Sequence, residues 1–173
     1  MKNIKRVLCL VLTLLMVAST VSVFAAFSDV PTTASYEKAV SALSQLGIIK
    51  GYDDGTFKPD NDVTRAEFTA MLMRTMGAGS IGSSSSADLP FSDVSDQNSD
   101  ISWSIPNINT AYKNGIVNGY EDGTFRPNDK VAYEEAVKMV VCALGYGENI
   151  SVDATPWYSN FMAQARSLGI LKG

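Results

Sequence analysis

Histidine is absent from this chain of 173 residues, and cysteine occurs only twice. The lack of histidine excludes the commonest general base, the commonest zinc ligand and every catalytic pairing of histidine with serine or cysteine. Cys9 and Cys142 both lie in apolar stretches and are interpreted as buried hydrophobic residues, and only Cys142 remains beyond residue 25. We therefore expect no catalytic residue, no disulfide, no metal site and no cofactor.

Basic residues are also scarce once the N-terminus is set aside. Lys2, Lys5 and Arg6 are three of the 14 basic residues, and all 18 acidic residues lie beyond them. Residues 26–173 therefore carry 11 basic and 18 acidic side chains, a net charge of −7. Such a chain has no general attraction to nucleic acid or to anionic lipid. An anionic ligand would have to be bound by a local group of donors.

A long apolar run occurs at the N-terminus. Residues 7–18 follow the basic stretch with only Thr13 as an interruption, and residues 23–25 are of the kind that signal peptidase recognises. This pattern predicts a secretory signal peptide over residues 1–25. A membrane anchor is the alternative, but the run is shorter than the ~20 residues that span a bilayer. We expect an exported protein with no membrane contact after cleavage.

The rest of the chain repeats itself. Residues 51–59, Gly-Tyr-Asp-Asp-Gly-Thr-Phe-Lys-Pro, match residues 119–127 at seven of nine positions, and Phe-Ser-Asp-Val occurs at 27–30 and again at 91–94. A third motif, glycine followed by apolar residues, begins at Gly47, Gly115 and Gly169. Internal repetition of this kind indicates a tandem array of small structural units. We divide the chain after the signal peptide into repeat one (26–77), a flexible Gly/Ser-rich linker (78–90), repeat two (91–147) and the first half of repeat three (148–173).

Each full repeat is expected to contain two helices joined by a tight turn. In repeat one, apolar residues with helical spacing predict a helix with a buried face, formed by Tyr36, Ala39, Val40, Leu43 and Leu46. The helix should end at a glycine with left-handed backbone conformation. After the Asp-Gly turn, Thr64 and Glu67 have the spacing of a capping box that opens a second helix. The pattern predicts an all-α protein.

In this order the motifs resemble the S-layer homology domain, over essentially all of the chain beyond the signal peptide except the linker. The resemblance implies tandem helix-loop-helix repeats in a pseudo-threefold helical bundle. It also implies a non-catalytic module at the cell wall or cell surface (the S-layer), which binds pyruvylated secondary cell-wall polysaccharide non-covalently. We expect this polysaccharide, and no nucleic acid, as the partner.

The resemblance also implies the binding residues. Arg65 would contact the carboxylate of the pyruvate ketal, since a helix's first turn offers free amides and a positive dipole end, and a guanidinium adds a bidentate donor. Thr64 and Glu67 would shape the cap beside it. The remaining polysaccharide-binding residues implied are Asp29, a sugar-hydroxyl acceptor, and Gly51, a close backbone approach, with Asp93, Trp103 and Gly119 in repeat two.

Repeat two departs from this pattern. Residues 132–135, Ala-Tyr-Glu-Glu, replace residues 64–67, Thr-Arg-Ala-Glu, so the arginine is lost. We therefore predict one competent groove, formed by repeat one with a neighbour.

Simpler roles remain open for the same residues: Arg65 as a solvated residue after a cap, Asp29 and Asp93 as caps of the segment before the first helix, and Trp103 and Trp157 as core residues. The Asp-Gly turns could suggest calcium, but they lack the alternating acids of an EF-hand loop. Because the third repeat stops after its first half, we expect a truncated chain or the start of a longer product. That product would be a wall- or polysaccharide-degrading enzyme or an S-layer lattice protein.

Overall fold

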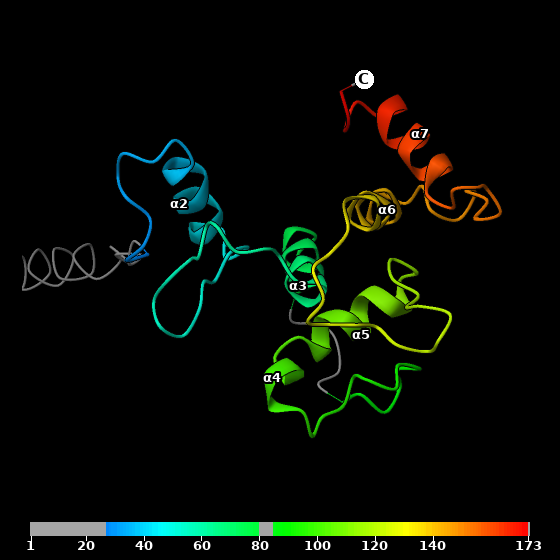
Figure 1. The fold of residues 1–173 in the computed structure, drawn as a ribbon, viewed down its shortest axis with the longest axis horizontal. Helices are drawn as coiled ribbons and strands as arrows, with labels where there is room; N and C mark the ends of the chain where they lie inside the picture. Colours follow the sequence, from blue (N-terminus) through cyan, green and yellow to red (C-terminus); the bar gives the residue numbers. More distant parts are fainter. Residues whose placement is uncertain (1–26, 80–84, 173) are drawn as a thin grey trace, which may run out of the picture.

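The computed structural model describes residues 27–79 and 85–172, and there all regular elements are helices (Figure 1). The predicted signal peptide and residues 80–84 of the predicted linker lie outside these residues. No helix in the described part is long and apolar enough to cross a membrane. The helices are α2 (Glu37–Gln45), α3 (Arg65–Thr75), α4 (Ser99–Ser102), α5 (Ile105–Lys113), α6 (Tyr133–Ala143) and α7 (Ser159–Ser167). The all-α prediction is confirmed.

Local sequence explains where the helices begin and end. The Thr64 hydroxyl accepts from the Glu67 amide at 3.2 Å, and the Glu67 carboxylate accepts from the Thr64 amide at 2.8 Å, so the capping box of α3 is confirmed. Ala132 has no side-chain acceptor, and α6 retains only the second half of this motif, from the Ala132 amide to Glu135. The predicted left-handed glycines after α2, α5 and α7 are confirmed at Gly47, Gly115 and Gly169.

The second helix of each repeat packs on the first helix of the next. Helix α3 packs on α5, and α6 packs on α7, while α3 also contacts α6. The main core lies between α3 and α5 and includes Met73, Ile105 and Ile108, all fully buried. A smaller core includes Val141 of α6 and Phe161 of α7. The half repeat at the C-terminus is therefore docked through its helix.

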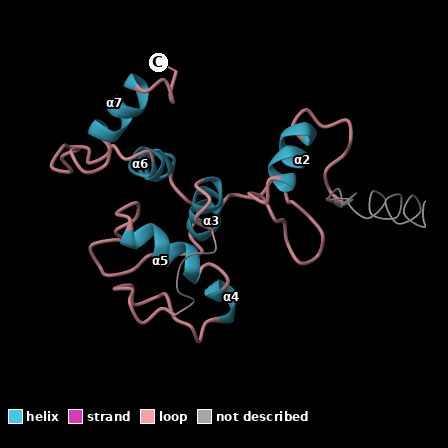
Figure 2. Cartoon of the chain, turned by 180° about the vertical axis from the view of Figure 1, so that it is seen from behind, coloured by secondary structure: helices cyan, strands magenta, loops and turns pink. Residues whose placement is uncertain are grey.

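Helix α2 lies apart from the other helices (Figures 1 and 2). Of its predicted buried face, Val40 is buried, but Tyr36 and Leu43 are exposed and Leu46 is 73% exposed. The prediction that this whole face is buried is wrong for the described chain. Packing joins each first helix to the second helix of the repeat before it, and no such helix precedes α2 within the described residues. Pseudo-threefold closure of the bundle stays a prediction.

Residues 85–90 of the predicted linker are folded against repeat two. The Ser86 amide donates to the Asp96 carboxylate at 2.6 Å, and Leu89 packs on the main core. Lys113 of α5 lies 3.3 Å from Asp88. This half of the segment is therefore part of repeat two's structure, contrary to the prediction of a flexible linker.

Candidate functional site

A groove of about 530 Å³ lies where the three repeats meet. Among the described residues, repeat one contributes Arg65 alone, from the first turn of α3, and the half repeat contributes Trp157 alone, two residues before α7. Repeat two provides the rest of the wall, from its Asp-Gly turn and from α6. The lining residues that carry charge or aromatic rings are Arg65, Tyr120, Glu121, Asp122, Arg126, Glu135, Lys138 and Trp157.

Arg65 is buried in the wall of this groove and is only 6% exposed. One guanidinium nitrogen, Nη1, lies 3.3 Å from the carboxylate of Glu135. The guanidinium carbon lies 4.9 Å from the ring centre of Phe125 and 5.1 Å from that of Tyr120. Its Nε has no hydrogen-bond partner among the described residues. The arginine of repeat one thus belongs to a site built mainly by repeat two.

The backbone at the start of α3 is not open to a ligand. The Arg65 amide donates to the Asp129 carbonyl at 2.8 Å, and the Ala66 amide donates to the Pro127 carbonyl at 2.9 Å. The next amide, that of Glu67, donates to the Thr64 hydroxyl. The prediction that free amides here attract an anion is therefore wrong, because repeat two's carbonyls occupy them. An anion contact at the start of α3 would therefore come from the Arg65 side chain.

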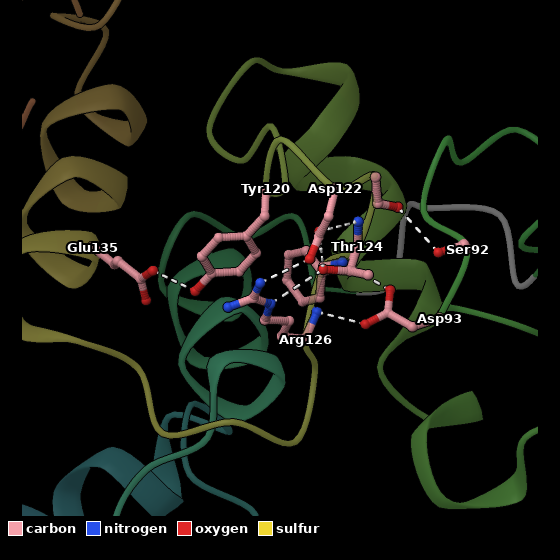
Figure 3. A network of polar contacts seen from close by, with 9 residues as sticks. Ser92, Asp93, Tyr120, Asp122, Thr124, Arg126 and Glu135 are labelled. Carbon is pink, nitrogen blue, oxygen red and sulfur yellow. Dashed lines mark hydrogen bonds and ion pairs between the residues drawn. The ribbon is translucent and has the colours of Figure 1, made fainter.

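Tyr120 and Glu135 join the turn to helix α6, as Figure 3 shows. The Tyr120 hydroxyl donates to one Glu135 carboxylate oxygen, and the other oxygen accepts from the Ala132 amide at 3.1 Å. Burial, together with the hydrogen bond to Glu135, raises the pKa of Tyr120 to about 12. Repeat one has the same pair, with the Tyr52 hydroxyl 2.7 Å from Glu67. Glu67 therefore braces its own turn as well as capping its helix.

Asp93, which is not among the lining residues of the groove, braces the same turn. Its two carboxylate oxygens accept from the Phe125 and Arg126 amides, each at 2.7 Å (Figure 3). The bonds hold Arg126 at a φ of 57°, which a non-glycine residue seldom adopts. Both carboxylate oxygens of Asp93 thus accept from backbone amides. These contacts differ from both predicted roles, which were to accept from a sugar hydroxyl or to cap the segment before the first helix.

Asp29 has the same place in repeat one, with the Phe57 amide at 2.8 Å and the Lys58 amide at 2.6 Å. These hydrogen bonds, chiefly the one from Phe57, hold the pKa of Asp29 below its usual value. Lys58 is also left-handed, at a φ of 56°. The Phe-Ser-Asp-Val motif is therefore conformationally tied to the Asp-Gly turn within each repeat.

One aspartate of each Asp-Gly turn, Asp54 or Asp122, is also engaged. Asp122 accepts hydrogen bonds from the Thr124 hydroxyl and amide and lies 2.8 Å from Arg126. These donors, of which the Thr124 hydroxyl has the largest effect, lower the pKa of Asp122 to about 2. Asp54 of repeat one has the same partners in Thr56 and Lys58. Over residues 27–79 and 85–172 there is no cluster of three or more potential metal ligands.

Gly51 and Gly119 allow close approach by the protein's own aromatic rings. Both have positive φ, 69° and 74°. A Cβ at Gly51 would lie 2.2 Å from a ring carbon of Phe27, and one at Gly119 would lie 2.5 Å from a ring carbon of Phe91. Of the two glycines, Gly119 lines the groove.

The two tryptophans differ in position. Trp103, a predicted site residue, is 47% exposed, donates to the Asp100 carbonyl and is not among the residues that line the groove. Trp157 lines the groove and is 41% exposed, with its ring edge-on to Tyr158 and Phe161. Trp157, Tyr120 and Lys138 line the groove but were not predicted from the sequence as site residues. A tyrosine occurs at the same place before the Asp-Gly turn in both repeats, and this repetition is the sequence signal that could have identified Tyr120.

The predicted residues are thus only partly brought together. Arg65 and Gly119 line the groove, and Thr64 and Glu67 shape the helix turn that presents Arg65. Asp93 does not line the groove but holds the turn that does. The other predicted residues, Asp29, Gly51 and Trp103, do not line it.

Comparison with known proteins identifies the repeats. The family model of the S-layer homology domain matches residues 26–69 and 90–137, together more than half of the chain. A cell surface protein of Thermoanaerobacter kivui is 33% identical over 100% of this chain and 22% of its own length. A surface layer protein of Brevibacillus choshinensis is 33% identical over 81% of this chain and 12% of its own. An endoglucanase of a Bacillus species is 37% identical over 71% of this chain and 12% of its own.

The chain thus spans less than a quarter of the length of these relatives. The family is that of an anchoring module, and two of these relatives are named as surface proteins, which supports a cell-surface location and a role in surface anchoring. The repeated motifs, the helix-loop-helix units and the family match agree: this chain belongs to the S-layer homology domain family.

Proposed function

We propose that this chain anchors an exported protein to the bacterial cell wall by binding secondary cell-wall polysaccharide, in its pyruvylated form, in the groove between the repeats. The observation that carries the proposal is Arg65. Its guanidinium is buried in the groove wall, yet Nε has no partner among the described residues. A buried donor without a partner costs about 1–3 kcal/mol, a cost that a ligand oxygen would remove.

The remainder of the groove suits a sugar polymer. Tyr120 and Trp157 offer aromatic rings, on which the apolar face of a sugar ring can pack. Glu121 offers an acceptor for sugar hydroxyls. The groove is also formed jointly by successive repeats, so a bound polymer would contact all three and hold them together.

The alternative concerns the whole protein from which such a module comes. The endoglucanase relative carries the matched region within a much longer chain. In that reading the repeats anchor a wall- or polysaccharide-degrading enzyme, or an S-layer lattice protein, and the chemistry or lattice contacts lie elsewhere. In the groove of the described residues, the acids Asp122 and Glu135 are both engaged in ion pairs, with Arg126 and Arg65 respectively.

Co-sedimentation with purified wall sacculi tests the proposal. The chain of residues 26–173 should pellet with intact sacculi and remain in the supernatant after the secondary polysaccharide has been chemically stripped. Equal pelleting with both preparations would contradict the proposal, because the bound component would then be peptidoglycan. A variant with Arg65→Ala should be lost from intact sacculi, whereas Lys113→Ala, which changes the same charge outside the groove, should pellet normally.

A further inference from the structure

The groove is lined by three basic side chains, and two of them are already paired within the protein. Arg126 lies 2.8 Å from Asp122, and Arg65 lies 3.3 Å from Glu135. An anionic ligand that approached either would have to compete with a carboxylate held in place by further hydrogen bonds. The third basic residue, Lys138, therefore has a distinct position.

Lys138 has neither an ion pair nor a hydrogen bond with any described residue. Its ammonium lies 5.9 Å from the ring centres of both Trp157 and Phe161. Burial lowers the pKa of Lys138 and Arg65 acts in the same direction, whereas Cys142 and Glu135 act to raise it. The ammonium is half-buried against two aromatic rings and forms no ion pair with a carboxylate of the described residues, so an anion in the groove would give it a direct partner.

The corresponding position of repeat one shows that packing does not require a lysine here. With Thr64 aligned to Ala132, Lys138 corresponds to Ala70, which is fully buried. A small apolar residue thus suffices at this position of the second helix in repeat one. The lysine occurs where the helix faces the groove and the tryptophan of the next repeat.

We propose that Lys138 is the residue that recognises a carboxylate on the polymer, while the sugar ring that carries it packs on Trp157. This inference rests on the proposed function and assigns charge recognition to a different side chain. Arg65 then forms the wall and donates through Nε, and Lys138 provides a positive charge that is in no ion pair with a described residue. The recognition depends on the half repeat, because Trp157 belongs to it.

The test combines a protein change with a ligand change. The full chain and its Lys138→Met variant are titrated with purified wall polysaccharide, native or with its carboxylates amidated by carbodiimide and methylamine. Amidation removes carboxylate charge and leaves phosphate charge. Wild type should bind the amidated polymer about tenfold less tightly than the native one, the size expected for one charge-assisted contact. Lys138→Met should lose about the same factor on native polymer and little more on amidation, and Lys113→Met should behave as wild type.

The outcomes separate the two proposals. If wild type binds neither polymer, the proposed function fails and this inference with it. If wild type binds both polymers equally, or loses binding only when phosphate is removed with hydrofluoric acid, polysaccharide binding stands and the carboxylate assignment is wrong. If Lys138→Met, with its thermal unfolding unchanged, responds to amidation as strongly as wild type, Lys138 does not recognise the carboxylate.

Discussion

Arg65 of repeat one and Glu135 of repeat two form an ion pair across the boundary between repeats, 3.3 Å apart with side chains 7% and 14% exposed. Each residue occupies the first turn of the second helix of its repeat. Glu135 also accepts a hydrogen bond from the Tyr120 hydroxyl, so a single carboxylate links the arginine of one repeat to the turn of the next. Both residues of this junction line the groove.

Removal of Arg65 should therefore destabilise the junction as well as abolish binding. Arg65→Met leaves Glu135 nearly buried without its cation, and the free energy of unfolding should fall by about 3 kcal/mol. Urea unfolding of Arg65→Met, Glu135→Gln and the double variant measures the coupling, which should be about 1–3 kcal/mol. Additive effects in this cycle would mean that the pair does not hold the repeats together.

Two glycines of the repeat-two turn provide a matched comparison. Gly119→Ala and Gly123→Ala both place a side chain at positive φ, which costs about 1–2 kcal/mol. Only at Gly119 would the new Cβ collide, 2.5 Å from the Phe91 ring, whereas nothing lies within 4 Å at Gly123. Chemical denaturation should rank Gly119→Ala as clearly less stable than Gly123→Ala. Equal stabilities would show that the ring does not pack on this glycine.

The sequence was a good guide to local structure and a poor one to the junction. The capping box at Thr64 follows from four adjacent residues, so it could be predicted from them alone. The partner of Arg65 lies 70 positions away in another repeat, and nothing in Thr-Arg-Ala-Glu indicates it. Motif spacing did not show that the amides at the start of α3 bind repeat-two carbonyls. For the same reason Trp157, which reaches the groove only through the docking of α7, could not be assigned.

Substitution of the two aspartates that brace the turns, Asp93 and Asp29, should affect polysaccharide affinity differently. Asp93→Ala removes the acceptors of the Phe125 and Arg126 amides, so the turn that lines the groove should relax and polysaccharide binding should fall by about tenfold or more. Asp29→Ala makes the same change in repeat one, outside the groove, and should lower thermal stability with little effect on binding. Calorimetric titration of both variants checks this, and an equal loss of affinity would contradict a single groove at the repeat-two turn.

Alkaline pH should loosen both turns through their tyrosines. Tyr52 and Tyr120 each have a pKa raised from 10.0 to about 12, the first chiefly by its hydrogen bond to Glu67 and the second chiefly by burial. Because the folded-state pKa exceeds the unfolded one, their contribution to stability is fully present below pH 10 and is lost as pH rises through about 12. Denaturation midpoints measured from pH 9 to 12 should fall in wild type, and less steeply in Tyr52→Phe/Tyr120→Phe. Identical slopes would contradict the assignment.

Tryptophan fluorescence offers the most direct test that the groove is the binding site. The chain has two tryptophans, of which Trp157 lines the groove and Trp103 does not. In a Trp103→Phe variant, the emission reports Trp157 alone. Addition of purified secondary cell-wall polysaccharide should shift or quench this emission saturably. The effect should occur at polysaccharide concentrations comparable to those at which the chain co-sediments with intact sacculi. Unchanged Trp157 emission in a variant that still binds the polysaccharide would show that the polymer binds elsewhere.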